Sequence, residues 1–236
     1  MTITIVHASP RSKGTSSTIA RNLASKFDGA KINEINLQKE QIPYCQGCLR
    51  CVTKGMEFCP HQEKILPLRD LMLEADLLIV ATPVYILHMN GQLKTFIDHF
   101  SSWFMMHRPE NSMFNKQLVV VSTAAGPVYK NTIKEVAECF TYFGIPKIYS
   151  IGMAVQSMSW AKVSEKKKDE IEKQSNKIVK SVNKLYQSGK YHTPLKSKFN
   201  FAVYRKIQSK VAGDVDRAYW DERGWFGNNR PWKKAK

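Results

Sequence analysis

The sequence lacks any uninterrupted apolar run long enough to form a helix across a bilayer. Its first residues, MTITIVHASPRSK, also lack the basic start, long apolar stretch and small-residue cleavage site of a secretory signal peptide. We therefore expect a cytoplasmic protein. At 236 residues the chain is long enough to bury a full hydrophobic core without disulfides or metals as staples.

Cysteines are few, and four of the five lie in one short segment, CQGCLRCVTKGMEFCP, at residues 45–60. In a reducing compartment, clustered cysteines rarely form structural disulfides. The segment therefore favours metal binding or redox chemistry. The fifth cysteine, Cys139, falls in a helical apolar pattern and is predicted to lie in the core.

Acidic residues are also scarce: 20 Asp and Glu stand against 36 Lys and Arg, giving a formal net charge of +16. Most of the excess follows residue 150. A basic surface of this kind attracts nucleic acid, acidic lipid or acidic protein, or it stays solvated. We favour a solvated surface and expect no nucleic-acid partner, because acidic residues such as Glu165 and Asp169 flank the lysine run at 166–168.

Strand-like and helix-like segments alternate through the first 188 residues. Apolar or β-branched runs predict strands at 2–8, 32–37, 76–82, 117–122 and 145–151. Amphipathic patterns predict helices at 15–27, 65–75, 90–103, 129–143 and 162–188. This alternation indicates an α/β domain with a parallel sheet between two helical layers. Ligands bind beyond the carboxyl ends of such strands, so the loops after Ala8, Thr82 and Ser122 are the candidate site.

The chain after residue 188 departs from this alternation. A proline in YHTPLKSKFN begins an extension, and apolar residues every fourth position over 199–211 predict one more amphipathic helix. We therefore divide the chain into a domain at 1–188 and a basic, aromatic-rich extension at 189–236. Together with Tyr85, we expect the tail residues Trp220, Trp225 and Trp232 to shape a site for an electron acceptor.

The loop after the first strand, ASPRSKGTSSTIA, is rich in hydroxyls and opens a helix. It is neither a Walker loop nor a G-x-G-x-x-G dinucleotide turn. A helix start offers unpaired N–H groups to an anion, so the loop predicts a cradle for one phosphate monoester, such as that of FMN; alternatively, the hydroxyls only cap the helix. The candidate ligands are Ser9, Arg11, Ser12, Gly14, Thr15, Ser16 and Ser17.

The loop after the third strand, TPVYILHMNGQLKTFIDHF, carries a more specific pattern. Together with SPR-x-x-G near the start, it resembles the NADPH-dependent FMN reductase family of the flavodoxin-like fold. The resemblance covers about residues 1–151. It implies a three-layer flavodoxin-like fold with a five-stranded parallel sheet, here with a C-terminal helical extension, and a homodimer or homotetramer.

The resemblance also implies FMN as cofactor, NAD(P)H as hydride donor and a small-molecule or protein acceptor. Since the flavin carries the chemistry, no catalytic acid or base is assigned. The flavin ring is expected against Pro83, Val84, Tyr85 and Ile86, and against Thr123, Ala124, Ala125 and Gly126. The family's usual arginine after Asp98 is His99 here.

The cysteine segment has the spacing C-x2-C-x2-C, with Cys59 following after seven residues where ferredoxins have three. It resembles the iron–sulfur flavoproteins, which implies a four-iron, four-sulfur cluster on Cys45, Cys48, Cys51 and Cys59 and, as an alternative function, an electron carrier with a ferredoxin-type donor. Unliganded thiols are an equal alternative. Zinc is a weaker one, because structural zinc sites split their ligands into separated pairs.

Overall fold

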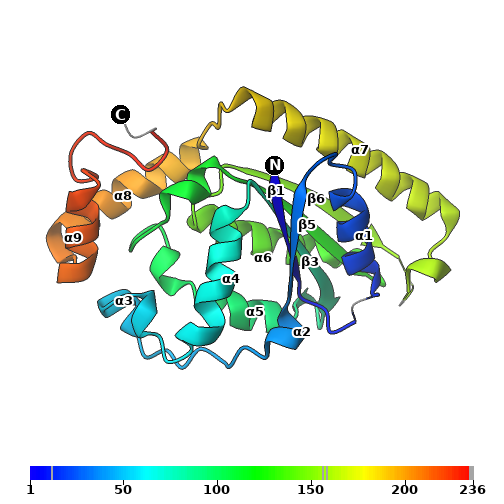
Figure 1. Cartoon of the computed structure of the whole chain (residues 1–236), viewed down its shortest axis with the longest axis horizontal. Helices are drawn as coiled ribbons and strands as arrows, with labels where there is room; N and C mark the ends of the chain where they lie inside the picture. The colour runs from blue at the N-terminus through cyan, green and yellow to red at the C-terminus, as the bar shows by residue number, and fades with distance from the viewer. Residues whose placement is uncertain (12, 156, 158, 234–236) are drawn as a thin grey trace.

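The computed structural model describes residues 1–11, 13–155, 157 and 159–233. A parallel sheet in the order β2-β1-β3-β5-β6 forms its centre (Figure 1). The predicted α/β fold with five parallel strands is thereby confirmed. A short β4 pairs antiparallel with the end of β3 and was not predicted. The strands are β1 (Thr2–His7), β2 (Lys31–Asn36), β3 (Leu77–Tyr85), β4 (His88–Met89), β5 (Gln117–Ala124) and β6 (Lys147–Ala154).

Helices cover both faces of the sheet, with α1 and α7 on one side and α4, α5 and α6 on the other (Figure 1). The first five are α1 (Thr15–Ala24), α2 (Leu37–Glu40), α3 (Arg50–Thr53), α4 (Gln62–Glu74) and α5 (Gly91–Asp98). The others are α6 (Tyr129–Tyr142), α7 (Glu165–Ser188), α8 (Leu195–Val211) and α9 (Asp214–Glu222). No helix in the described part of the chain has the length and apolar character of a membrane span.

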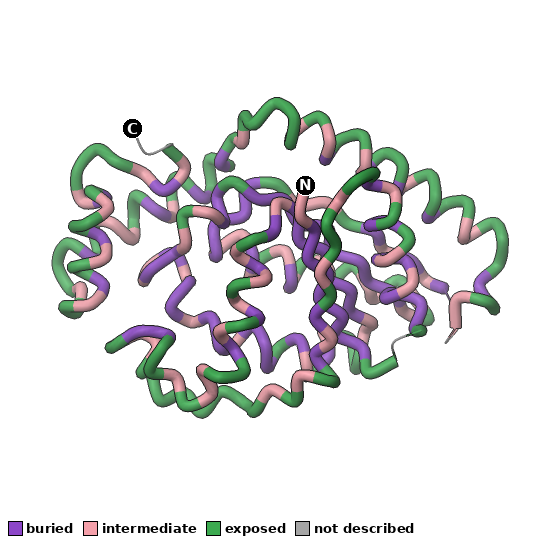
Figure 2. Tube along the Cα trace, in the orientation of Figure 1, coloured by how far each residue is buried: buried purple, intermediate pink, exposed green. Residues whose placement is uncertain are grey.

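The alternation of side chains along each strand divides the core between these two layers. In β1, Ile3 and Ile5 pack with α1 and α7, whereas Val6 packs with α4, α5 and α6. Successive side chains of a strand point to opposite faces. Since both faces of the sheet are covered, β3 and β5 contain continuous apolar runs, and the buried residues of β1, β3 and β5 form the purple centre of Figure 2.

Two predicted boundaries near the third strand are wrong. The strand predicted to end at residue 82 continues through Pro83 to Tyr85, and the turn falls at Ile86 and Leu87, which have φ angles of 44° and 69°. A β-branched residue such as Ile rarely adopts positive φ, so the sequence gives no turn signal there. The helix predicted to reach residue 103 ends at Asp98.

The C-terminal extension packs onto the body through an aromatic cluster. Trp220, Trp225 and Phe201 are buried together with Met105 and Phe114 of the segment that precedes β5. The predicted helix over 199–211 is confirmed and begins earlier, at the first residue of α8. Because Trp220 and Trp225 are fully buried in this cluster, our prediction that they shape an acceptor site is wrong.

Candidate cofactor site

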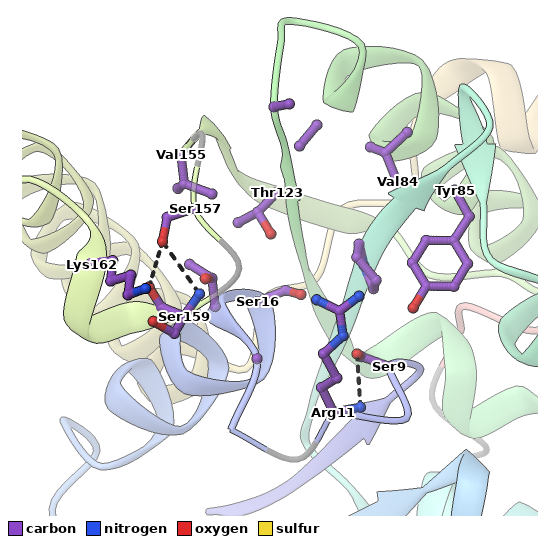
Figure 3. Close-up of a pocket in the computed structure, with 15 residues that line it drawn as sticks. Ser9, Arg11, Ser16, Val84, Tyr85, Thr123, Val155, Ser157, Ser159 and Lys162 are labelled. Carbon is purple, nitrogen blue, oxygen red and sulfur yellow. Dashed lines mark hydrogen bonds between the residues drawn. The ribbon is translucent and has the colours of Figure 1, made fainter.

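A cavity of about 840 Å³ opens at the carboxyl ends of β1, β3, β5 and β6. The chain continues from β1 to the edge strand β2 but from β3 towards the opposite edge, so the order reverses between β1 and β3, where open α/β sheets bind ligands. Figure 3 shows the residues that line it. They are Ser9, Arg11, Gly14, Thr15, Ser16, Pro83, Val84, Tyr85, Thr123, Ala124, Ala125, Val155, Ser157, Ser159 and Lys162.

The first loop meets the cavity at the amino end of α1. The residue that precedes the helix is Gly14, which has no side chain to cap it, and among the described residues no side-chain capping hydrogen bond is formed there. The described loop hydroxyls therefore do not serve as helix caps. The first-turn N–H groups, which lack an intrahelical acceptor in any α-helix, face a lining of hydroxyls at the positive end of the helix dipole.

At this end of the cavity, Thr15 offers a hydroxyl and Arg11 a guanidinium to a bound ligand. The Thr15 side chain is buried, and its Oγ1 has no hydrogen-bond partner among the described residues. A buried hydroxyl without a partner is costly, so a ligand atom that accepts from it would stabilise the site. Arg11 is exposed, and its guanidinium extends into the cavity (Figure 3). Ser9 Oγ accepts a hydrogen bond of 3.1 Å from the Arg11 backbone N–H, which fixes the turn.

The opposite side of the cavity is flatter and less polar. Pro83 pairs in register with Thr123 of β5, so the ends of these two strands form one surface. Val84 and the Tyr85 ring continue this surface from β3 (Figure 3). The combination of a cationic, hydroxyl-lined end and an apolar wall with aromatic and backbone groups suits a phosphorylated, planar ligand.

Asn90 joins the first and third loops, and it was missed from the sequence. Its buried side chain donates from Nδ2 to the Ala8 carbonyl at 2.6 Å, and its Oδ1 accepts from the Leu93 N–H at 3.3 Å. The same side chain thus caps α5 and holds the end of β1. Asn followed by a helical pattern was the available signal for the cap, but no local pattern predicts the contact with Ala8.

A buried histidine, His7, ends β1 just before the loop that leads to α1. His7 is fully buried, its Nε2 lies 3.2 Å from Glu34 Oε2, and Arg21 makes a bidentate hydrogen-bonded pair with the same carboxylate. Burial, followed by the charge of Arg21, lowers the pKa of His7 to about 4, although Glu34 opposes the shift. His7 is therefore neutral in the folded protein at pH 7.

Acid should destabilise the fold through His7. Its pKa falls from 6.5 in the unfolded chain to about 4 on folding, so the unfolded chain takes up the proton first. The free energy of unfolding should fall between pH 6.5 and 4, by about 3 kcal/mol from this group. Urea titrations across this range should show a shallower loss for His7→Gln. An identical pH profile for wild type and variant would refute this assignment.

The structure separates the predicted ligands into those that line the cavity and those that do not. Ser17 is buried in α1, and neither it nor Gly126 lines the cavity; Ile86 lies at the hairpin tip with 91% exposure and does not line it either. Ser12 lies outside the described residues. The loop after β6 was missed entirely: Val155, Ser157, Ser159 and Lys162 line the cavity, and no phosphate-loop or aromatic signal distinguished them.

The four clustered cysteines line a second, smaller cavity of about 30 Å³. Burial raises the pKa of Cys51, and the nearby thiols Cys59, Cys45 and Cys48 raise it further. Among the residues that the structure describes, no three His, Cys, Asp or Glu side chains are arranged to hold one metal ion. The donor set thus has the chemistry of a four-iron cluster site, but its side chains are not arranged as a closed ligand shell.

His99, the residue that departs from the family pattern, also belongs to this second cavity. Its Nε2 lies 2.8 Å from the Pro43 carbonyl oxygen, to which it donates, and its Nδ1 lies 3.9 Å from Cys59 Sγ. Burial lowers the pKa of His99. The ring of His61 packs against it edge to face, with centroids 5.5 Å apart. His99 therefore anchors the start of the cysteine segment to the end of α5.

The fold is an α/β architecture with a ligand cavity at its switch point, and the comparisons give the class of protein. A match to the family of NADPH-dependent FMN reductases spans residues 1–150, from β1 into β6. The chain belongs to this family, and the family resemblance inferred from the sequence motifs is confirmed. The class of the protein is that of the FMN-dependent NAD(P)H oxidoreductases.

Individual relatives differ in how much of the chain they share. An iron–sulfur flavoprotein of Archaeoglobus fulgidus is 24% identical over 225 residues, which cover 92% of this chain and 96% of that protein. A putative NAD(P)H-dependent FMN-containing oxidoreductase of Bacillus subtilis is 32% identical over 120 residues, or 51% and 62% of the two chains. The solved FMN-dependent NADH-azoreductase of Bacillus anthracis superposes with a TM-score of 0.55 at 11% identity, covering 79% of this chain and all of that one. This last likeness shows the fold.

Proposed function

We propose that this chain holds FMN in the cavity at the ends of β1, β3 and β5 and uses it to pass electrons from NAD(P)H to an acceptor in the cytoplasm. One observation carries the proposal: the buried Thr15 hydroxyl, which has no hydrogen-bond partner among the described residues, lies at a helix start and lines the same cavity of about 840 Å³ as the cation of Arg11. The names of the relatives from Archaeoglobus fulgidus and Bacillus subtilis support a flavin in the chain.

The two ends of the cavity would bind different parts of FMN. At the α1 end, Arg11, Thr15 and Ser16 would bind the phosphate, because charge-assisted hydrogen bonds to phosphate oxygens are the strong ones. At the other end, the edge formed by Pro83, Val84 and Tyr85 would hold the flat ring system. Ala124 and Ala125 place backbone rather than bulky side chains along the same wall.

Bound FMN would supply the chemistry itself, accepting a hydride and releasing electrons singly or in pairs. The chain's own residues would bind, orient and shield the cofactor. The largely apolar wall from β3 and β5 would exclude water from one side of the ring, while the open side of the cavity would admit NAD(P)H. No acid or base from the chain is assigned a proton-transfer step.

Anaerobic titration with NAD(P)H tests this function. We expect the purified protein to show flavin absorbance bands that bleach stoichiometrically when NADPH or NADH is added without oxygen. Comparison of the two nucleotides identifies the preferred donor. A protein that carries flavin but stays oxidised with both nucleotides would contradict the proposal.

A second candidate function is that of an electron carrier served by a ferredoxin-type donor. Its specific support is the convergence of four cysteines on one cavity, together with the name and full-length match of the Archaeoglobus fulgidus relative. In this function, Cys45, Cys48, Cys51 and Cys59 would hold a four-iron cluster that exchanges single electrons with the flavin.

Iron and acid-labile sulfide assays on protein purified without oxygen decide this second candidate. About four of each per chain would support a cluster. Replacement of Cys59 by Ser should then lower both contents, whereas replacement of Cys139, which packs against the core away from the segment, should not. Zinc in place of iron, or no metal, would contradict the cluster.

We also propose that the chain assembles as a homodimer or homotetramer, as the family resemblance implies. Two apolar surfaces support it. The hairpin tip exposes Ile86 and Leu87, and one ridge of α8 exposes Leu195, Phe199 and Val211. Light scattering coupled to size-exclusion chromatography measures the mass directly. A monomer mass at micromolar concentration would contradict the proposal.

A further inference from the structure

The C-terminal extension reaches the cysteine segment through a buried chain of hydrogen bonds. Asp216 of α9 is 6% exposed, and its carboxylate pairs with the guanidinium of Arg108 and with His107 Nδ1, the latter at 2.7 Å. Arg108 in turn donates to the backbone carbonyl oxygens of Cys51 and Val52, the latter at 2.8 Å. Arg108 and Asp216, which are 108 positions apart in the sequence, are thus linked to each other and to the α3 backbone.

The α3 helix needs such an external anchor. It has only four residues, Arg50–Thr53, none of which is fully buried, and it begins after Leu49 in the left-handed conformation. A helix of this length is unstable by itself, and its apolar packing is limited to partly buried residues such as Cys51, which lies against the core. The Arg108 contacts satisfy two carbonyl groups at its carboxyl end, where a cation is favoured.

We propose that Arg108 and Asp216 are positioning residues of the cysteine site: Asp216 orients the Arg108 guanidinium, and Arg108 fixes the backbone that carries Cys51. The extension at 189–236 is then a functional part of that site rather than an appendage. What this implies for a metal cluster rests on the second function proposed above, whereas the anchoring of α3 does not.

The anchor also sets the charge beside Cys51. Arg108 and Asp216 are a nearly buried pair, so neutralising one of them changes the charge beside the other, and without Arg108 the Asp216 carboxylate keeps His107 as a partner. Asp216→Asn leaves a cation near the site and should raise the reduction potential of a cluster bound there. Arg108→Gln leaves an anion and should lower it. A residue that serves only general stability would not shift the potential in opposite directions.

Hydrogen exchange of the protein as purified tests the anchor without any need for iron. The amide protons of residues 52–55 bond to carbonyls of Leu49 and Arg50. Their exchange should become about tenfold faster or more in Arg108→Gln and in Asp216→Asn, because each loses charged hydrogen bonds. Asp221→Asn makes the same charge change at an exposed position of α9 and should exchange like wild type. Arg108→Lys should lie in between and carries the test if Arg108→Gln does not fold.

Each outcome decides the proposal. The proposal is supported, whether or not iron is bound, if amide exchange becomes faster only at residues 52–55 in the Arg108 and Asp216 variants and is unchanged in Asp221→Asn. Wild-type exchange rates in Asp216→Asn and Arg108→Gln overturn it, as does a potential that moves in the same direction in both variants. Absence of iron from the wild-type protein would refute the cluster while leaving the exchange result to decide the anchor.

Discussion

Replacement of Thr15 by Val should weaken FMN binding without destabilising the flavin-free protein. The Thr15 hydroxyl is buried and has no partner in the described structure, so the flavin-free fold loses no hydrogen bond when it is removed. A hydrogen bond to a charged phosphate contributes about 1.5 to 3 kcal/mol, so the dissociation constant should rise about 10-fold to 100-fold. Fluorescence titration of the flavin-free protein with FMN measures the change.

Thr18→Val is the matched control for this prediction. Thr18 lies on the same helix, but its Oγ1 donates to the Gly14 carbonyl oxygen at 3.1 Å. We expect this variant to lose about 1 kcal/mol of stability or less and to bind FMN as wild type does. If Thr15→Val bound FMN normally, the phosphate assignment at this end of the cavity would be wrong. It would also be wrong if the variant lost as much free energy of unfolding as it lost free energy of FMN binding.

Replacement of Trp220 by Ala should cause the largest loss of stability among single changes in the extension. Trp220 is fully buried and stacks on Phe201 with ring centroids 5.0 Å apart, and the ring of Trp225 packs against it edge to face at 5.4 Å. Its Nε1 also donates to the His107 carbonyl oxygen. A large cavity and a lost hydrogen bond together should cost about 3 to 5 kcal/mol of unfolding free energy in urea titrations.

Phe199→Ala provides the comparison, because it removes an aromatic ring from the same extension at a site that is 69% exposed. Its unfolding free energy should change by about 0.5 kcal/mol or less. Equal effects of the two substitutions would show that the extension is not packed on the body as described.

Trp220→Ala should also speed the amide hydrogen exchange of α3, because Trp220 and Asp216 lie on the same helix, α9.

The sequence was sufficient to predict the sheet and three of the four loops around the cavity. Strands buried on both faces contain continuous apolar runs, such as DLLIVAT at residues 76–82, which covers most of β3. Phosphate-binding loops need hydroxyls and a helix start, and both are visible in the sequence. These are local signals. The end of β3 was mispredicted because Pro83 is a strong turn signal, and pairing with β5 and β4 overrides it.

Features that depend on distant contacts had no local signal. The loop after β6 contributes Ser157 and Ser159, which resemble any polar loop residues in the sequence. The α9 helix, with its many charges, shows no wide apolar face, yet tertiary packing of Trp220 fixes it. Likewise, nothing local links Arg108 to Asp216, because that pairing exists only once the extension has folded back onto the body.

Quantification of the flavin released from the purified protein tests the central claim most directly. The protein is denatured by heat, and the flavin in the supernatant is identified by chromatography and counted against chain concentration. The account predicts FMN at close to one per chain, and much less from Thr15→Val purified in parallel. Release of FAD, or protein that neither contains FMN nor takes it up when FMN is added, would contradict the account.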